Sequence, residues 1–192
     1  LSIMRGVFDT KYSNLAGNMM RDPGVQRIAI LEGVRTPLCR ARKGALKDAT
    51  PDRLLASALS GLMASFRSEG KLTLDMVDDI VVGNVLQPGG GAAMARMAML
   101  RAGFPETTTL ATTNRQCSSG LQALAAVAGS ILLGTAQVGI AAGVESMTHD
   151  SIVPPNIDAE FLKDSSPAAD CMVPMGVTSD TLAKEFGISR EK

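Results

Sequence analysis

The sequence predicts an α/β fold, in which a largely parallel sheet carries helices on both of its faces. Two features of the 192 residues point to this class. Short runs of apolar and β-branched residues alternate along the chain with longer segments in which apolar residues recur at helical spacing. The composition, with 45% hydrophobic and 20% charged residues, is sufficient for a packed core.

Four segments are predicted to be strands, because each is rich in β-branched or other apolar residues and is bounded by turn-forming or polar ones. They are residues 25–31, 77–85, 107–113 and 138–144. The first two contain continuous apolar runs, so we expect both of their faces to be buried.

Helices are predicted over residues 50–70, 92–101 and 121–133, and a short one over residues 178–186. Thr50 and Pro51 are typical of a helix start, and Gly70 of a helix end. The third helix is apolar on nearly all sides, but the apolar run is too short and too interrupted for a membrane span. We therefore expect it to be buried inside the protein.

The two ends of the chain differ from this regular pattern. Residues 1–24 show no sustained period and are interpreted as an N-terminal extension, followed by an α/β domain over residues 25–150. Residues 148–173 are rich in proline, asparagine and aspartate and are predicted to be mostly loop. Ser189 resembles a helix N-cap with only three residues after it, so we expect the natural protein to continue.

The composition excludes several classes of function. Nineteen basic and nineteen acidic residues give a net charge of zero, which is not the signature of a nucleic-acid-binding protein. Cys39, Cys117 and Cys171 are far apart, so neither a disulfide framework nor a zinc site is indicated, and a reducing compartment is the simplest inference. The glycine-rich residues 87–91 match neither phosphate-binding glycine pattern.

Two further groups of residues have more than one interpretation. The basic residues of the loop 35–44 are either a solvated surface or a contact to another subunit, or else they help to hold an anionic ligand. His149, the only histidine, lies in the predicted loop region, where a surface residue is expected more often than a catalytic base.

Cys117 is the main candidate for chemistry. It lies between the predicted strand 107–113 and the predicted helix 121–133, near the carboxyl end of a strand, where ligands bind in open α/β sheets. We expect the N–H groups of the first helical turn to lack partners there, which together with the helix dipole favours a nucleophilic thiolate. The alternative is that Cys117 is a small buried apolar residue.

Residues 114–123, which read Asn-Arg-Gln-Cys-Ser-Ser-Gly-Leu-Gln-Ala, resemble the active-site motif of the thiolase family, in the form found in its peroxisomal 3-ketoacyl-CoA members. Further matches support this resemblance, at residues 35–37, 83–89, 143–147, 174–178 and 186–191. Together they span residues 25–192 in the order and spacing of the family.

The resemblance implies two similar α/β halves, each a mixed, mostly parallel five-strand sheet with a buried helix, and a loop domain inserted in the first half. Residues 25–150 would form this first half and residues 151–192 would begin the loop domain. Family members cleave a 3-ketoacyl-CoA with CoA to acetyl-CoA and a shortened acyl-CoA, the last step of fatty-acid β-oxidation. By resemblance, Cys117 carries the acyl group as a thioester and contributes its N–H to an oxyanion hole, and Met175 lies beside the reactive end of the substrate.

The resemblance also implies CoA as co-substrate, no other cofactor and no metal, a homodimer or homotetramer, and a peroxisomal location, with the mitochondrion as the alternative. Two other functions stay open: a condensing thiolase that makes acetoacetyl-CoA, and a non-catalytic half-thiolase that binds acyl-CoA or a full-length subunit. The family's second half supplies a histidine, an asparagine and a second cysteine whose motifs do not occur in these 192 residues. We therefore expect the chain alone to be inactive, and His149 does not replace the missing base.

Overall fold

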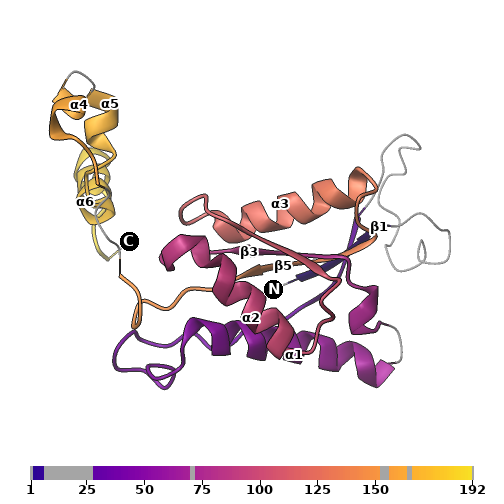
Figure 1. Ribbon diagram of the computed structural model, residues 1–192. Coiled ribbons are helices and arrows are strands. Elements are labelled where there is room, and N and C mark those ends of the chain that lie inside the picture. Colours follow the sequence, from indigo (N-terminus) through magenta and orange to yellow (C-terminus); the bar gives the residue numbers. More distant parts are fainter. Residues whose placement is uncertain (1, 7–27, 70–71, 152–155, 164–165, 192) are drawn as a thin grey trace. The chain divides into compact units, whose positions relative to one another are not determined.

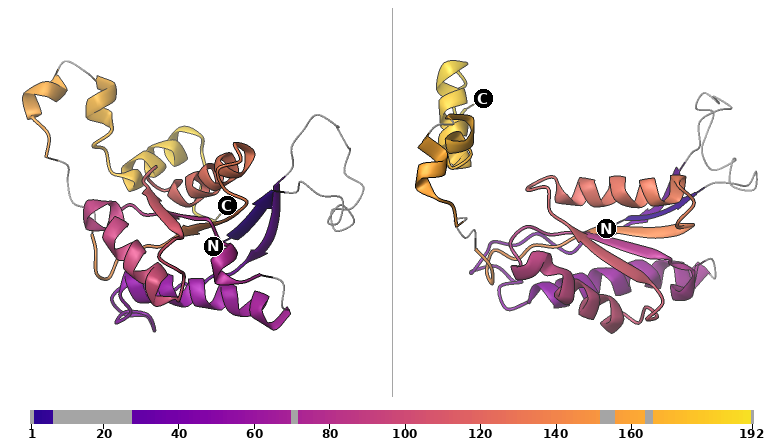
Figure 2. Two further views of the ribbon diagram at one scale, coloured as in Figure 1. Left: turned by 45° about the vertical axis from the view of Figure 1, so that its right-hand side comes forward. Right: turned by 45° about the horizontal axis from the view of Figure 1, so that its top comes forward.

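The computed structural model describes residues 2–6, 28–69, 72–151, 156–163 and 166–191 (Figure 1). The chain divides into two compact units, Leu1–Ile152 and Val153–Lys192. In the first unit a five-stranded sheet lies between one helix on one face and two helices on the other, as Figure 2 shows most clearly in its right-hand view. The predicted α/β class, with helices on both faces of the sheet, is confirmed.

The sheet is mixed, as the resemblance implies. Its strands are β1 (Ser2–Gly6), β2 (Ile28–Gly33), β3 (Asp79–Gly83), β4 (Thr109–Thr113) and β5 (Val138–Gly143). They lie in the order β2-β1-β5-β3-β4. Strand β3 pairs in parallel with β4 and β5, whereas β1 is antiparallel to both β2 and β5. All strands except β1 therefore run in one direction, and their carboxyl ends share one edge of the sheet.

Strand β1 corrects one prediction. Residues 1–24 were expected to be an extension outside the fold, but Ser2–Gly6 form an inner strand between β2 and β5. Five residues are too few to show a periodicity, and the strand is defined by its pairing with segments more than twenty residues away. Residues 7–24 of the expected extension lie outside the described residues.

The expectation that the first predicted strand is buried on both faces is wrong. Strand β2 begins at Ile28, and it lies at one edge of the sheet. The side chain of Ile30 is 60% exposed and that of Leu31 is 38% exposed. An apolar run therefore does not distinguish a central strand from an edge strand whose outer side is uncovered. Residues 25–27 lie outside the described residues.

The predicted strands at the centre of the sheet are confirmed. Their side chains alternate between the two faces, as strand geometry requires. Ile80, Val82 and Ile140 pack into the larger core, under α1 (Pro51–Glu69) and α2 (Ala92–Arg101). Val81 and Ala141 pack into a second core, under α3 (Ser119–Leu132). The predicted strand 107–113 is shortened to β4, because the chain turns through Pro105–Thr108, with the N–H of Thr108 bonded to the carbonyl of Pro105 at 3.2 Å.

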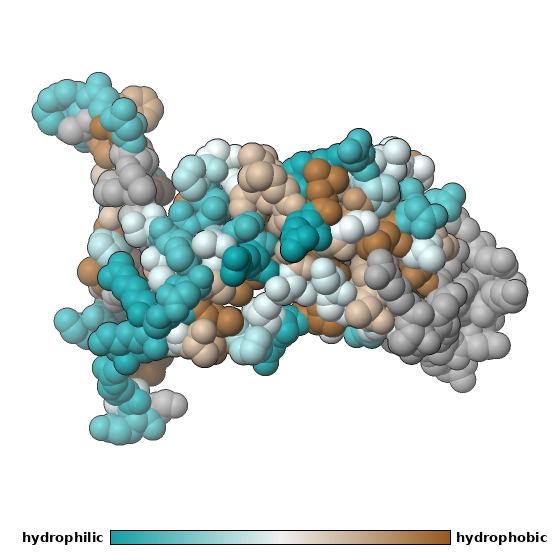
Figure 3. All heavy atoms as spheres, turned by 60° about the horizontal axis from the view of Figure 1, so that its bottom comes forward, coloured by the Kyte–Doolittle hydropathy of each residue, from teal (hydrophilic) through white to brown (hydrophobic). Residues whose placement is uncertain are grey.

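Helices α1 (Pro51–Glu69) and α2 (Ala92–Arg101) cover one face of the sheet, and both were predicted. Helix α1 buries one stripe of apolar side chains at helical spacing: Leu55, Leu59, Leu62, Met63 and Phe66. Figure 3 turns this face toward the viewer and shows hydrophilic and hydrophobic side chains interspersed over it. Gly70, predicted to end the helix, lies outside the described residues.

Helix α3 (Ser119–Leu132) covers the other face of the sheet. It buries Ala123, Val127 and Ile131 against β3 and β5. Its opposite side is uncovered within the described residues, since Leu121 is 70% exposed and Leu133, just after the helix, is 81% exposed. The expectation of a helix buried on all sides is therefore met on one side only.

The second unit contains three helices among its described residues: α4 (Ala159–Lys163), α5 (Ser166–Asp170) and α6 (Met175–Glu185). The first two correct the prediction of loop over residues 148–173 in part, since one or two turns of helix are too short to show an apolar stripe. The other described residues of this stretch are not helical, as predicted. Helix α6 begins three residues before the predicted 178, directly after Pro174. The region after Ser189 forms a turn at Arg190 and Glu191.

Candidate active site

Cys117 lies at the carboxyl edge of the sheet, in the turn between the end of β4 and the start of α3. This is where the sequence predicts it. The side chain is exposed, so the alternative of a buried apolar cysteine is wrong. An accessible sulfur at the carboxyl ends of parallel strands is in a position to meet a ligand.

The turn that carries Cys117 is held by side chains of its own residues. Gln116 has a φ of 49°, a left-handed conformation that is unfavourable for a residue with a side chain. Asn114 Oδ1 accepts a hydrogen bond from the Gln116 N–H at 3.0 Å. Ser119 Oγ accepts from the Arg115 N–H at 2.9 Å and donates to the Gln116 carbonyl at 2.6 Å. These bonds stabilise an unusual backbone immediately before the cysteine.

The start of α3 differs in one respect from the expectation. The N–H of Ser119, in the first turn, is bonded to the Gln116 carbonyl at 3.0 Å, and the N–H of Ser118 is bonded to the Arg115 carbonyl at 3.1 Å. The prediction that the N–H groups at this point have no partners is therefore wrong for Ser119. The side chain of Ser118, the N-cap residue, makes no capping hydrogen bond.

Two residues that sequence reasoning did not single out join the neighbouring strand ends. Glu145 follows β5, and its carboxylate accepts hydrogen bonds from the N–H groups of Val85 at 3.0 Å and Leu86 at 3.1 Å. Asn84 follows β3 and is 1% exposed. Its side-chain amide donates to the Val144 carbonyl at 2.8 Å and to Glu145 Oε1 at 3.2 Å. The matched segments 83–89 and 143–147 contain both residues, but their mutual contact is visible only in three dimensions.

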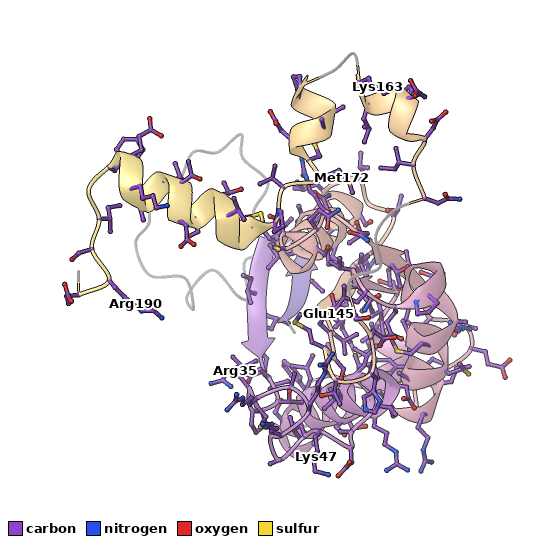
Figure 4. All side chains as sticks on the ribbon, turned by 90° about the vertical axis from the view of Figure 1, so that its left-hand side faces the viewer. Arg35, Lys47, Glu145, Lys163, Met172 and Arg190 are labelled. Carbon is purple, nitrogen blue, oxygen red and sulfur yellow. The ribbon has the colours of Figure 1, made fainter. Side chains whose placement is uncertain are left out.

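A cavity of about 380 Å³ opens at this edge of the sheet and includes Cys117 in its wall. Much of the lining is apolar, with Val34, Leu54 and Val85 among the residues concerned, and Arg35 and Glu145 add one charge of each sign. Figure 4 looks at this side of the first unit with Arg35 and Glu145 labelled. A largely apolar hollow with a few polar groups and a free thiol is suited to a ligand that has an apolar part and an electrophilic part.

The other candidate residues lie elsewhere or in the second unit. Cys39 and His149 are exposed residues of the first unit, and neither lines the cavity. The basic residues Arg40, Arg42 and Lys43 are exposed as well, so among these loop cations it is Arg35 that reaches the cavity wall. Cys171 is exposed in the second unit.

Met175 is the first residue of α6, in the second unit, and it is 77% exposed. Within the described ranges, no group of three or more histidine, cysteine, aspartate or glutamate side chains is arranged to hold a metal ion. No helix among the described residues is both long and apolar enough to cross a membrane.

Comparisons with known proteins agree with the arrangement around Cys117. The family model for the N-terminal domain of thiolases matches residues 28–192. The chain is 49% identical over 166 residues to the peroxisomal 3-ketoacyl-CoA thiolase B of Rattus norvegicus, which covers 86% of this chain and 38% of the rat protein.

Two solved structures from Saccharomyces cerevisiae are similar to the chain. The dimeric peroxisomal thiolase matches with a TM-score of 0.70 and 37% identity, over 79% of this chain and 39% of the yeast one. A peroxisomal 3-ketoacyl-CoA thiolase, described as a five-layered structure built from two core domains of identical topology, matches with a TM-score of 0.53 and 38% identity, over 58% of this chain and 32% of that one.

The chain thus spans a little over a third of the length of the relatives that it matches. The family model covers nearly all of the described residues, including the turn with Cys117 and both units. On this ground, the chain belongs to the thiolase family.

Proposed function

We propose that the protein to which this chain belongs is a 3-ketoacyl-CoA thiolase that acts in the last step of fatty-acid β-oxidation. The observation that carries the proposal is the exposed Cys117 in the turn between β4 and α3, within the residues that match the thiolase model. The rat relative is named a peroxisomal 3-ketoacyl-CoA thiolase and the yeast one a peroxisomal thiolase. They favour this form over a condensing thiolase, and the peroxisome over the mitochondrion.

In the proposed reaction the Cys117 thiolate attacks the 3-keto carbon of the substrate, and a sulfur–carbon bond forms. The bond between C2 and C3 of the substrate then breaks, and acetyl-CoA leaves after its C2 takes up a proton. The thiol of free CoA next attacks the thioester carbonyl, releases the shortened acyl-CoA and returns a proton to the site. The backbone N–H of Cys117 would stabilise the oxyanion of each addition.

The cavity beside Cys117 supports a substrate with an apolar part, because its wall is largely aliphatic. CoA is the co-substrate in this proposal, and no further cofactor or metal takes part. Met175 is proposed to lie beside the reactive end of the bound substrate, with residues 151–192 forming the beginning of the loop domain and residues 25–150 the first core.

Proton transfer has no histidine beside Cys117, because His149, the only histidine of the chain, does not line the cavity. By resemblance, a second core supplies the histidine, the asparagine and the second cysteine. The uncovered side of α3, with Leu121 and Leu133 exposed, supports docking of such a core there, giving the layered arrangement described for the yeast enzyme. We therefore propose that the 192 residues alone do not turn over substrate, and that the complete protein assembles as a homodimer or homotetramer.

Acyl trapping tests the proposal. The protein expressed from its complete coding sequence is mixed with a 3-ketoacyl-CoA, quenched in acid and digested, and the peptides are analysed by mass spectrometry. The acyl mass is expected on the peptide with Cys117, and the Cys117→Ala variant is expected to lose it. Acylation of Cys39 or Cys171 in its place would refute the site, and steady thiolysis by the 192-residue chain would refute the need for a second core.

A further inference from the structure

We propose that Glu145 is a positioning residue for Cys117, and that it acts through the backbone of Val85 and the side chain of Asn114. This inference rests on the proposed function, in which Cys117 is the reactive nucleophile. Glu145 bonds to Asn84, Val85 and Leu86, and the link to the cysteine runs through further hydrogen bonds.

The carboxylate of Glu145 is bound by N–H donors, and no ion pair of it is recorded among the described residues. Oε2 accepts from the Val85 N–H at 3.0 Å, and Oε1 accepts from the Leu86 N–H at 3.1 Å and from Asn84 Nδ2 at 3.2 Å. Hydrogen bonds to an ionised acceptor are about twice as strong as neutral ones. The segment that follows β3 is therefore fixed to the end of β5 by one side chain.

Asn84 makes this connection rigid. It is buried, and all of its polar atoms are used: Nδ2 donates to the Val144 carbonyl and to Glu145, and Oδ1 accepts from the Gln87 N–H at 3.1 Å. Gly91, with a φ of 71°, packs beside it, since a Cβ there would lie 2.9 Å from Asn84 Oδ1. The amide consequently has no other arrangement available without leaving a buried polar atom unpaired.

The backbone of Val85 connects Glu145 to the turn that carries Cys117. Its N–H is held by Glu145, and its carbonyl accepts a hydrogen bond from Asn114 Nδ2 at 3.4 Å. The other atom of the same amide, Asn114 Oδ1, accepts from the Gln116 N–H at 3.0 Å. Asn114 therefore joins the fixed segment after β3 to the residue that precedes Cys117.

Gln116 is the residue whose backbone conformation these hydrogen bonds stabilise. Its left-handed φ of 49° is unfavourable for a residue with a Cβ, and such a conformation persists only where its surroundings hold it. When Glu145 no longer fixes Val85, Asn114 loses a fixed partner and Gln116 can relax toward an ordinary φ. Cys117 would then turn away from the start of α3, where a thiolate is favoured.

The test compares two carboxylates that bind backbone N–H groups at opposite edges of the same sheet. In Glu145→Ala both acceptor oxygens are removed, so Val85 and Leu86 both lose their acceptor. The control is Asp78→Ala: Asp78 Oδ2 accepts from the N–H groups of Gln137 at 2.7 Å and Val138 at 3.1 Å, at the amino ends of the strands. Both variants lose support of the backbone, but only the first is connected to Cys117.

The readout is the rate of alkylation of each cysteine by iodoacetamide in the protein expressed from its complete coding sequence, measured by peptide mass spectrometry. In Glu145→Ala the rate at Cys117 is expected to fall at least fivefold relative to Cys39 and Cys171 in the same molecule, whereas Asp78→Ala leaves these ratios unchanged. Unchanged ratios in a folded Glu145→Ala, or an equal fall in Asp78→Ala, would overturn the proposal.

Asn114→Ala provides a second test if Glu145→Ala does not fold, because Asn114 forms the other end of the same series of hydrogen bonds. The same selective fall is expected, and its absence would overturn the proposal. The outcome is separable from that of acyl trapping: if alkylation falls as expected but no acyl group is trapped on Cys117, the positioning role stands and the proposed function fails.

Discussion

The backbone of Gly83 lies against the backbone of Ser119, so that a Cβ built on Gly83 would be 2.5 Å from the Ser119 carbonyl carbon and 2.6 Å from its oxygen. Gly83 is the last residue of β3 and Ser119 the first of α3. The start of the helix that follows Cys117 therefore rests on the end of the central strand, at a separation that only glycine permits.

Gly83→Ala is expected to lower the free energy of unfolding by about 3 kcal/mol, because the atoms that must move belong to the backbone. The matched control is Gly129→Ala near the carboxyl end of α3, where a Cβ meets nothing within 4 Å. There the change is expected to stabilise the protein by about 0.5–1 kcal/mol, since alanine favours helix. Urea unfolding followed by far-ultraviolet circular dichroism measures both, and equal effects of the two substitutions would contradict the contact.

Ser119→Ala removes a buried hydroxyl that serves two partners in the cysteine turn, the Arg115 N–H and the Gln116 carbonyl. We expect a loss of about 1–2 kcal/mol in unfolding free energy and a slower alkylation of Cys117. Ser118→Ala is the comparison, because Ser118 is exposed and its side chain makes no capping bond. Its unfolding free energy is expected to change by less than about 0.5 kcal/mol. A larger loss of unfolding free energy in Ser118→Ala than in Ser119→Ala would show that the hydroxyl of Ser119 does not stabilise the turn.

Asp52, in the first turn of α1, predicts a dependence of stability on pH. A hydrogen bond from the Thr50 side chain, with smaller help from the Arg53 backbone, holds the pKa of Asp52 below its usual value. A lowered pKa in the folded state stabilises the protein above the pKa of the unfolded state, about 3.9, and this contribution disappears as pH falls through the folded value. The carboxyl is exposed, so we expect an effect of only about a few tenths of a kcal/mol.

The measurement is urea unfolding of the natural chain and Asp52→Asn at about pH 7 and at about pH 2.5. The natural chain is expected to be the more stable at the higher pH and the difference to vanish at the lower one. In a Thr50→Val background, which removes the donor, the difference at the higher pH should shrink as well. A difference that persists unchanged at low pH would exclude the carboxylate as its origin.

Substitutions on the exposed and on the buried side of α3 are expected to affect different properties of the chain, its self-association and its unfolding free energy respectively. Leu133→Ser is expected to change the unfolding free energy by less than about 0.5 kcal/mol, because the side chain is 81% exposed. If this side docks a second core, the substitution should reduce self-association of the 192-residue chain in sedimentation velocity experiments. Ile131→Val, at a buried position of the same helix, is expected to have the opposite pattern. It should lower the unfolding free energy by about 0.5–1.5 kcal/mol and leave self-association unchanged. Unaltered association in Leu133→Ser would argue against docking at this side.

Much of the fold could be predicted because the relevant signals are local. The apolar run at Ile80–Val82, the helical spacing from Leu55 to Phe66 and the start at Pro51 are each contained within a few turns or one strand, and the structure has these elements where they were expected. Two of the predictions that were wrong share a different cause. The strand Ser2–Gly6 and the exposure of Ile30 depend on which segment pairs with which, and short-range patterns do not contain that information.

The candidate site divides in the same way. The sequence by itself determined that a cysteine, Cys117, stands between a strand and a helix within a motif of the thiolases, because nucleophile, turn and helix start are consecutive in the chain. Only the tertiary structure decided that Glu145 and Asn84 fix the neighbouring strand ends, across about sixty residues of sequence, and that Gly83 carries the start of α3. The reason is physical: a hydrogen bond or a close backbone contact depends on distance in space, which parallel pairing of β3 with β4 and β5 sets and residue order does not.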